Sequence, residues 1–235
     1  MATHFHLLGA AHFLILGTVV LLAVVLAVVE RRLVRGGKWL RIALGAVMLA
    51  DAGLWYGYLA WRGQRIFPSQ LPLELCDVTF YLVAFALLTF SPAVFDLAYY
   101  FALAGTSMAL LTPDLWEQFP SIATVQFFVE HGLAVAATLY LVWSGRMRPR
   151  PGSVWRAMLA LNCIAALDGT FDAIFKTNYM YLRAKPLELS LLNVLGPWPW
   201  YIVSTEVVAL GLFALLYLPF GRGGGVRAAD ARGRG

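Results

Sequence analysis

The sequence predicts an all-α, polytopic membrane helix bundle with seven transmembrane helices, its N-terminus outside and its C-terminus cytoplasmic. Three observations predict this class. Of the 235 residues, 60% are hydrophobic and 13% are charged, which is too little polar surface to coat a soluble domain. Apolar runs of about the length that crosses a bilayer recur along the chain. Lys and Arg are distributed unevenly between the segments that connect these runs.

Prolines and aromatic residues mark the ends of the apolar runs. Pro68, Pro92 and Pro113 fall in gaps between runs, and Trp61 and Trp143 stand at run ends, as an interfacial aromatic belt requires. The fourth run is the shortest. In chain order, the expected spans are His6–Val29, Leu40–Trp61, Leu71–Phe90, Val94–Leu111, Ala123–Trp143, Trp155–Phe175 and Trp200–Phe220.

The count of Lys and Arg in the connections gives the orientation. With seven spans, thirteen basic residues share one side, and the other side holds five: Arg62, Arg65, Lys176, Arg183 and Lys185. Basic residues concentrate in cytoplasmic loops, so the side with thirteen Lys and Arg residues is expected to face the cytoplasm. The membrane is expected to be the plasma membrane. The net charge of +5 then reflects topology, and no nucleic-acid partner is expected.

Residues 1–220 are expected to form one transmembrane domain. The Gly/Arg-rich tail, residues 221–235, is predicted to be a disordered cytoplasmic segment. Between the last two spans lies a long apolar connection, Thr177–Pro199, which is interpreted either as an interfacial or re-entrant segment or as an ordinary packed loop. Nothing in the sequence indicates the oligomeric state.

Ionisable residues inside the spans are the candidates for function, because a charge at the centre of a membrane helix costs roughly 2.5–3.5 kcal/mol. Helical rise places all of them about 5–15 Å below the outer boundary, whereas the inner halves of the spans are apolar. We therefore predict a polar cavity in the outer half, closed below by an apolar plug. Its expected residues are His12, Asp51, Asp77, Glu130, Asp168, Asp172 and Glu206. For any single acid, an interhelical hydrogen bond is the alternative interpretation.

Cys76 and His131 are the candidate catalytic pair. A thiol is a poor nucleophile until a base such as histidine takes its proton, and both residues lie in the outer half, at the depth of phospholipid ester carbonyls. The alternative for Cys76 is a small buried hydrophobic side chain, and for His131 a packed, hydrogen-bonded ring.

Helper residues are expected from neighbouring spans: Asp168 or Asp172 to orient the imidazole, and Thr79 or Asn162 to stabilise an oxyanion. Walker, GxGxxG, HExxH and GxSxG motifs do not occur in the sequence. No cofactor is expected, and no metal site, because His4 and His6 have no matching third ligand nearby.

Several stretches of this chain resemble bacterial YwaF-type integral membrane proteins, a group related to the eukaryotic transmembrane protein 164 family. They are Leu71–Asp77, Ala104–Asp114, Phe127–Gly132, Thr177–Tyr181 and Leu195–Tyr201. The resemblance implies a lipid acyltransferase that works through an acyl-cysteine, and by motif position it assigns the nucleophile to Cys76 and the histidine to His131. A more distant group, the androgen-induced hydrolases, cleaves fatty-acid esters with a threonine–histidine pair.

The predicted function is therefore an intramembrane acyltransferase or lipid ester hydrolase whose partner is a membrane phospholipid or acyl-lipid. Asp77 directly follows Cys76, and a carboxylate in that position disfavours a thiolate. One alternative is an ion-coupled transporter that uses the acidic residues as a proton site. Another is a non-catalytic lipid-binding or scaffold protein.

Overall fold

The computed structural model describes residues 5–33, 37–115, 117–186 and 191–221. All regular elements in these ranges are helices. They are α1 (Ala10–Arg32), α2 (Gly37–Trp61), α3 (Leu75–Thr89), α4 (Pro92–Tyr100), η1 (Phe101–Thr106), α5 (Ser107–Leu111), α6 (Ile122–Trp143), α7 (Ser153–Phe175), η2 (Tyr179–Tyr181), η3 (Leu191–Val194) and α8 (Trp200–Gly221). The tail expected to be disordered lies outside the described residues, except for Gly221.

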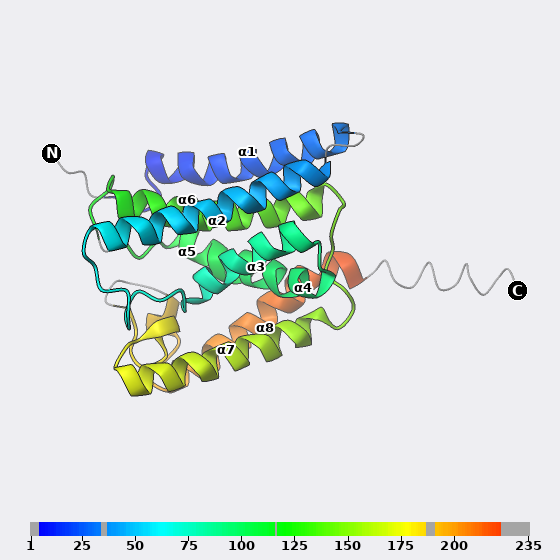
Figure 1. Cartoon of the computed structure of the whole chain (residues 1–235). Coiled ribbons are helices and arrows are strands. Elements are labelled where there is room, and N and C mark those ends of the chain that lie inside the picture. Colours follow the sequence, from blue (N-terminus) through cyan, green and yellow to red (C-terminus); the bar gives the residue numbers. More distant parts are fainter. Residues whose placement is uncertain (1–4, 34–36, 116, 187–190, 222–235) are drawn as a thin grey trace, which may run out of the picture.

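The helices run back and forth along one direction, as Figure 1 shows. Six helical segments in the described ranges are long and apolar enough to cross a membrane, when Pro92–Leu111 is counted as one continuous segment. The shorter apolar helix is α3, with 15 residues. The predicted all-helical, multi-pass membrane class is thereby confirmed.

The largest differences from the expected spans are at two helix starts. Helix α1 begins at Ala10 instead of His6, and α3 begins at Leu75 instead of Leu71. At α3 the reason is local: Pro72 has no N–H to donate, and Glu74 takes the N-cap position with extended backbone. The helix therefore starts after the residues that the apolar run alone would have included.

The fourth span is not a regular α-helix. Its middle part, η1, is a π-helix of six residues, a geometry that is rare and that recurs at functional sites. Gly105 in η1 faces the start of α3, since a Cβ built at Gly105 would lie 3.4 Å from Leu75 Cδ2. The π-helical segment therefore packs beside the first turn of α3.

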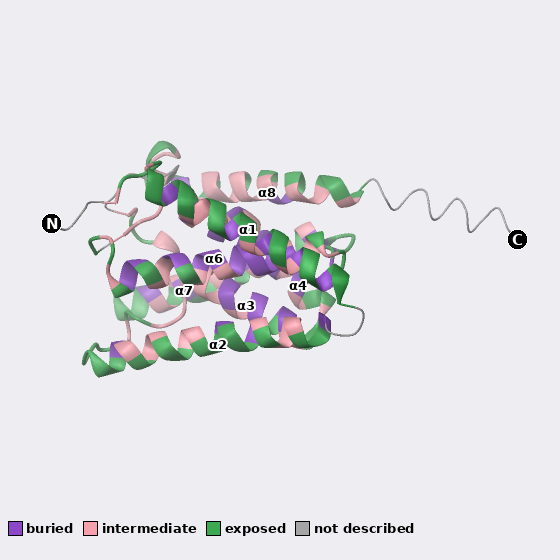
Figure 2. Ribbon diagram, turned by 90° about the horizontal axis from the view of Figure 1, so that it is seen from above, coloured by how far each residue is buried: buried purple, intermediate pink, exposed green. Residues whose placement is uncertain are grey.

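Helix α3 lies at the centre of the bundle, in contact with α2, α4, η1 and α6. Phe80, Val83, Ala84 and Leu87 on α3 are almost completely buried. Figure 2 shows this burial pattern, with the purple residues gathered on α3 and α6 and with few buried residues on α2 and α8, which are largely intermediate or exposed. The exposed apolar side chains of the outer helices are suited to contact lipid.

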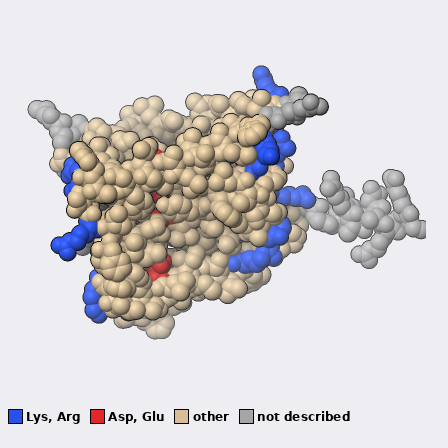
Figure 3. Space-filling view, viewed as in Figure 1, with Lys and Arg blue, Asp and Glu red and all other residues tan. Residues whose placement is uncertain are grey.

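The two ends of the bundle differ in their charged residues. One end, here called the acidic end, holds the carboxyl groups of Glu74, Asp77, Glu130, Asp168 and Asp172. The opposite end, the arginine end, holds Arg31, Arg32, Arg41, Arg146, Arg150 and Arg156, among others. In Figure 3, Lys and Arg lie at both ends, at the left and right of the view, and the face between them is largely free of basic residues.

A close approach of α2 to α3 gives a first prediction. A Cβ at Gly45 would lie 2.9 Å from Leu88 Cγ and 3.2 Å from the carbonyl oxygen of Ala84, whereas a Cβ at Gly53 on the same helix meets nothing within 4 Å. We expect Gly45→Ala to lower the free energy of unfolding by about 1–3 kcal/mol through overpacking. Gly53→Ala should be neutral or stabilising, because alanine is the better helix former. Thermal unfolding of both variants in detergent compares them, and equal stability would contradict the packing of α2 on α3.

Candidate functional site

Helix α3 begins well below the start of its neighbour α6. The carboxyl groups of Asp77, the third residue of α3, and Glu130 on α6 lie against each other and line the same small cavity. Glu130 lies eight residues after Ile122, or about 12 Å along α6. With 15 residues, α3 is only about 22 Å long. The first turn of α3 is therefore recessed into the bundle.

The recessed helix start is capped by two acidic side chains. The Glu74 carboxylate accepts from the N–H of Asp77, and Asp77 Oδ2 accepts from the N–H of Glu74 at 3.2 Å, so the two form a capping box. Glu74, in the connection before α3, also accepts from Met180 N at 2.8 Å. Burial raises the pKa of Glu74 to about 7, with smaller contributions from Asp77 and two acids of α7. Glu74 and Asp77 therefore stabilise the N-terminus of α3 by accepting hydrogen bonds from its backbone.

One group of acids joins α2, α3 and α6. Gln126 Nε2 donates to Asp51 Oδ2 at 2.9 Å, and Asp51 is close enough to Glu130 to interact with it electrostatically. Asp77, Gln126 and Glu130 line a cavity of about 10 Å³ together with Tyr56 and Tyr81, roughly the space that one water molecule needs. This group forms a small polar cavity beside the first turn of α3.

A second group of acids lies on α7. Asp172 is fully buried, and its Oδ1 accepts from Thr177 Oγ1 at 2.6 Å and from Tyr179 N at 3.0 Å. The Oδ2 atoms of Asp172 and Asp168 are both buried, and neither has a hydrogen-bond partner in the described part of the chain. Glu74 is the acid of the α3 cap that interacts electrostatically with both aspartates.

The start of the α7–α8 connection closes over the start of α3. Tyr179 OH donates to the carbonyl of Pro68 at 2.7 Å and accepts from Leu71 N at 2.9 Å, and Tyr181 OH donates to Asp114 Oδ2 at 2.8 Å. These bonds reach both the α2–α3 and the α5–α6 connections. This part of Thr177–Pro199 is therefore a packed loop, while residues 187–190 lie outside the described residues.

The two candidate catalytic residues lie in the same layer of the bundle. Cys76 is the second residue of α3 and half-buried, and His131 on α6 is buried. Because Asp77 contacts Glu130, the residue after Cys76 touches the residue before His131. His131 Nδ1 bonds to the carbonyl of Phe127 at 2.7 Å, and its ring stacks on that of Phe127 at 4.1 Å. The thiol and the imidazole have no hydrogen bond to each other among the described contacts.

The structure distributes the other candidate residues over several places. Asp168 and Asp172 are on α7, which packs against α4, α8 and η2, and the hydrogen bond that orients the His131 ring comes from a backbone carbonyl instead. Thr79 Oγ1 donates to Leu75 O of its own helix at 2.6 Å. Their helper roles stay predictions.

Three further candidates lie apart from the acids around α3. His12 Nδ1 accepts from Leu8 N at 3.0 Å, and its Nε2 is 2.7 Å from the carbonyl of Leu110, so backbone groups occupy both ring nitrogens. Asn162 on α7 donates to Glu206 on α8 at 2.9 Å, on an exposed part of the surface. The expected single cavity is thus divided among separate polar contacts.

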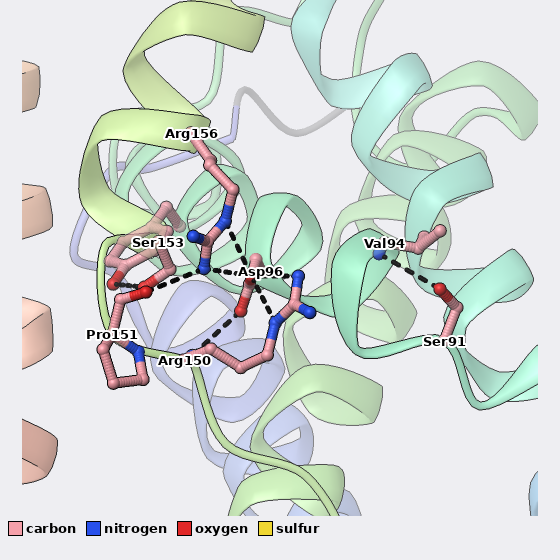
Figure 4. A network of polar contacts seen from close by, with 8 residues as sticks. Ser91, Val94, Asp96, Arg150, Pro151, Ser153 and Arg156 are labelled. Atoms are coloured by element: carbon pink, nitrogen blue, oxygen red, sulfur yellow. Dashed lines mark hydrogen bonds and ion pairs between the residues drawn. The ribbon is translucent and has the colours of Figure 1, made fainter. Parts of the chain in front are cut away.

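Sequence reasoning left out two buried acids at the arginine end, Glu30 and Asp96, whose side chains are 3% and 0% exposed. Glu30 pairs with Arg146 at 2.6 Å. Asp96 pairs with Arg150 and Arg156, both at 2.8 Å, as Figure 4 shows. The expectation of a purely apolar inner half is therefore corrected: an apolar core fills the middle of the bundle, and buried ion pairs lie below it. All ion pairs among the described residues are at this end.

Another feature that the spacing of acids did not indicate is Thr106 in η1. Its hydroxyl is buried and has no hydrogen-bond partner among the described residues. It follows Gly105, which faces Leu75 at the start of α3. The signal that could have pointed to this residue is the stretch Ala104–Asp114, one of those that carry the family resemblance.

The fold and these buried polar groups define a multi-pass, helical membrane protein with a polar layer recessed at one end. Within this class, the chain belongs to the TMEM164 family, whose sequence pattern matches residues 4–217. The chain is also 27% identical over 214 residues to an uncharacterized protein of Treponema pallidum (strain Nichols), which covers 90% of this chain and 88% of the relative. No solved structure matches the chain. Membership of the TMEM164 family fits a role in a membrane that concerns lipids.

Proposed function

We propose that this protein is an intramembrane lipid acyltransferase or lipid ester hydrolase, with Cys76 as nucleophile and His131 as base. The observation that carries the proposal is the Asp77–Glu130 contact. This contact sets the register of α3 on α6. Cys76 precedes Asp77 and His131 follows Glu130, so the thiol and the imidazole lie at the same level of the bundle. A nucleophile at that level is recessed from the end of the bundle, near the depth of phospholipid ester groups.

The hydrogen bond of His131 supports its role as a base. A carbonyl oxygen only accepts, so the 2.7 Å contact with Phe127 O means that Nδ1 carries the proton. In the neutral ring, the lone pair is then on Nε2, the nitrogen that takes up a proton. His12 differs, because its Nδ1 already accepts from Leu8 N and its Nε2 meets a carbonyl. Of these two histidines, His131 is the one suited to proton transfer.

The reaction has two steps. In the first, the Cys76 thiol gives its proton to His131 Nε2, and Sγ attacks the ester carbonyl carbon. The carbon–oxygen bond breaks, and the leaving alcohol takes the proton, which leaves a thioester on Cys76. In the second step, an acceptor hydroxyl or water gives its proton to Nε2 and attacks the thioester. The sulfur leaves and regains the proton.

The negative charge that develops on the carbonyl oxygen needs donors. The first intrahelical hydrogen bond of α3 runs from Val78 N to Glu74 O at 3.1 Å. The N–H groups of Leu75 and Cys76 precede Val78, and the first N–H groups of a helix have no intrahelical acceptor. We assign the oxyanion to these two backbone N–H groups, since the Thr79 hydroxyl donates to Leu75 O in this structure.

We further propose that α3 completes seven spans, with the acidic end outside and the arginine end in the cytoplasm of a plasma-membrane protein. Support comes from the back-and-forth course of the helices in Figure 1 and from the thirteen-to-five distribution of Lys and Arg. Helix α3 is short, and the α2–α3 connection before it completes the distance across the membrane. Tyr179 holds this connection in place through hydrogen bonds to Pro68 and Leu71.

Capture of the acyl-enzyme tests the proposal. The full chain in lipid nanodiscs is mixed with a phospholipid that carries a labelled acyl chain, quenched in acid, and digested. We expect up to one label per chain on the peptide with Cys76, and its release by neutral hydroxylamine, which cleaves thioesters. Label on the Cys163 peptide alone, or none at all, would contradict the mechanism.

The ion-coupled transporter is the second candidate. In its favour, the acids around α3 and α7 form no ion pair among the described residues, so a proton is a possible occupant of that layer. Against it, Phe80, Val83, Leu87 and Phe101 fill the centre of the bundle below these acids. Proton flux into liposomes, together with an unlabelled Cys76, would favour transport over acyl transfer.

A further inference from the structure

We propose that a cavity at the arginine end binds a phosphate group, as an anionic phospholipid headgroup would present it. This site is distinct from the layer around Cys76, and the proposal does not depend on acyl chemistry. The cavity has a volume of about 210 Å³, and its lining residues are Glu30, Gly37, Lys38, Arg41, Phe90 and Arg146. It is formed where α1, α3 and α6 end and where α2 begins.

The lining has an excess of positive charge. Lys38, Arg41 and Arg146 face one acid, Glu30, so the formal charge of the lining is 3 − 1 = +2. Both oxygens of Glu30 are already in use, since Oε1 accepts from Arg146 Nε at 2.6 Å and Oε2 accepts from Tyr140 OH at 3.0 Å. The Glu30 carboxylate therefore neutralises Arg146, and Lys38 and Arg41 have no anionic partner among the lining residues.

Gly37 explains how Glu30 is held against that wall. A Cβ at Gly37 would clash with Glu30 Oε1, so the carboxylate occupies the space that any larger residue would fill. Glu30 is 3% exposed, whereas the Arg146 side chain is 49% exposed. The guanidinium of Arg146 thus has one edge on Glu30 and other N–H groups available toward the cavity.

Arg41 supplies the independent observation that points to a ligand. Its Nη1 is buried and has no hydrogen-bond partner among the described residues, and its guanidinium lies over the Phe90 ring, 4.8 Å from the centroid. A buried donor without an acceptor is unfavourable, and the stacking fixes the plane of the group. Phosphate oxygens are the acceptors that a fixed guanidinium fork recognises best.

The place of the cavity favours a lipid over a dissolved ion. It lies at one end of the membrane-crossing helices, at the level of the basic residues that Figure 3 shows there. Basic pockets between helices at the cytoplasmic surface of a membrane are suited to anionic headgroups. A headgroup phosphate is already concentrated at that level, whereas a free anion has to come from solution.

Lipid retention by the full chain tests the proposal. The protein is purified in mild detergent and exchanged into phosphatidylglycerol, into phosphatidylcholine, or into phosphatidylcholine with millimolar inorganic phosphate, and bound lipid is counted by native mass spectrometry. We expect phosphatidylglycerol to be retained about tenfold more than phosphatidylcholine. Both lipids present a phosphate to the arginines, but the choline group of phosphatidylcholine adds a cation that the positively charged lining repels. If inorganic phosphate displaces the lipid, the same site also takes the free anion.

Three variants assign the binding to this cavity. Arg41→Gln should lower the retention of phosphatidylglycerol about tenfold, and Lys38→Gln, a change at an exposed residue, should lower it by a smaller factor. Arg148→Gln removes an exposed cation at the same end that does not line the cavity, and it should change nothing. Should Arg41→Gln fail to fold, Lys38→Gln decides. Equal retention of both lipids, or an equal effect of all variants, would overturn the proposal.

Discussion

The Cys76→Ala variant is expected to transfer or release acyl chains from phospholipid at least ~10³-fold more slowly than the native protein. Alanine keeps the helix start intact, because the cap of α3 is made by Glu74 and Asp77 and not by the thiol. It removes only the atom that would carry the acyl group. The measurement is the rate at which labelled fatty acid or labelled product lipid appears in nanodiscs.

Two further variants make that result specific. Cys163 is the other free cysteine, exposed on α7, and Cys163→Ala should keep the native rate. His131→Gln should slow the reaction by ~10²–10⁴, the usual contribution of a general base, with the Phe127 contact as the only hydrogen bond it loses in the described structure. A Cys76→Ala protein that folds and retains full activity would rule out the cysteine mechanism.

The Asp96→Ala variant is expected to lose about 3 kcal/mol of unfolding free energy, near the lower end of the cost of breaking a buried ion pair. Asp96 is completely buried. Its Oδ1 accepts from Arg150 N at 2.9 Å, and its Oδ2 accepts from both arginines. The loss is near the lower end because the Arg150 and Arg156 side chains are 43% and 44% exposed and can be hydrated.

This contact holds the start of α4 to the α6–α7 connection, as the close view of Figure 4 shows. Thermal unfolding in detergent measures the loss, and Arg148→Ala in the same connection serves as the matched control, with less than about 0.5 kcal/mol expected for a surface change. Asp96→Asn should fall between the two, since it keeps one oxygen acceptor for Arg150 N. An Asp96→Ala variant as stable as the Arg148→Ala control would show that the network contributes little.

Most helix ends were predictable because the length of an apolar run can be read along the chain without knowledge of the fold. Trp61, Trp143 and Phe175 end the expected and the observed helices alike, because the length of an apolar run and its aromatic ends are read directly from the residues. The start of α3 was placed four residues early, since hydropathy does not distinguish an apolar connection from a helix. Only the proline and the cap at Glu74 mark the true start.

The site was predictable only in part, because depth along a helix says nothing about the face on which a residue lies. Asp77 and Glu130 were expected in one polar layer, and they are in contact. Asn162 and Glu206 were expected in the same layer, but they pair with each other between α7 and α8. His12 was expected there as well, but it binds backbone groups of Leu8 and Leu110.

By itself, the sequence determined that this chain is a multi-pass helical membrane protein and where most of its helices begin and end, since bilayer thickness and the cost of charge in hydrocarbon act on each segment separately. The tertiary structure alone decided which polar groups meet. Arginines of the α6–α7 connection and of the first turn of α7, which the sequence marks only as topology signals, pair with Glu30 and Asp96. Such pairings depend on the rotation and register of packed helices, and these are set when the bundle buries its side chains against one another.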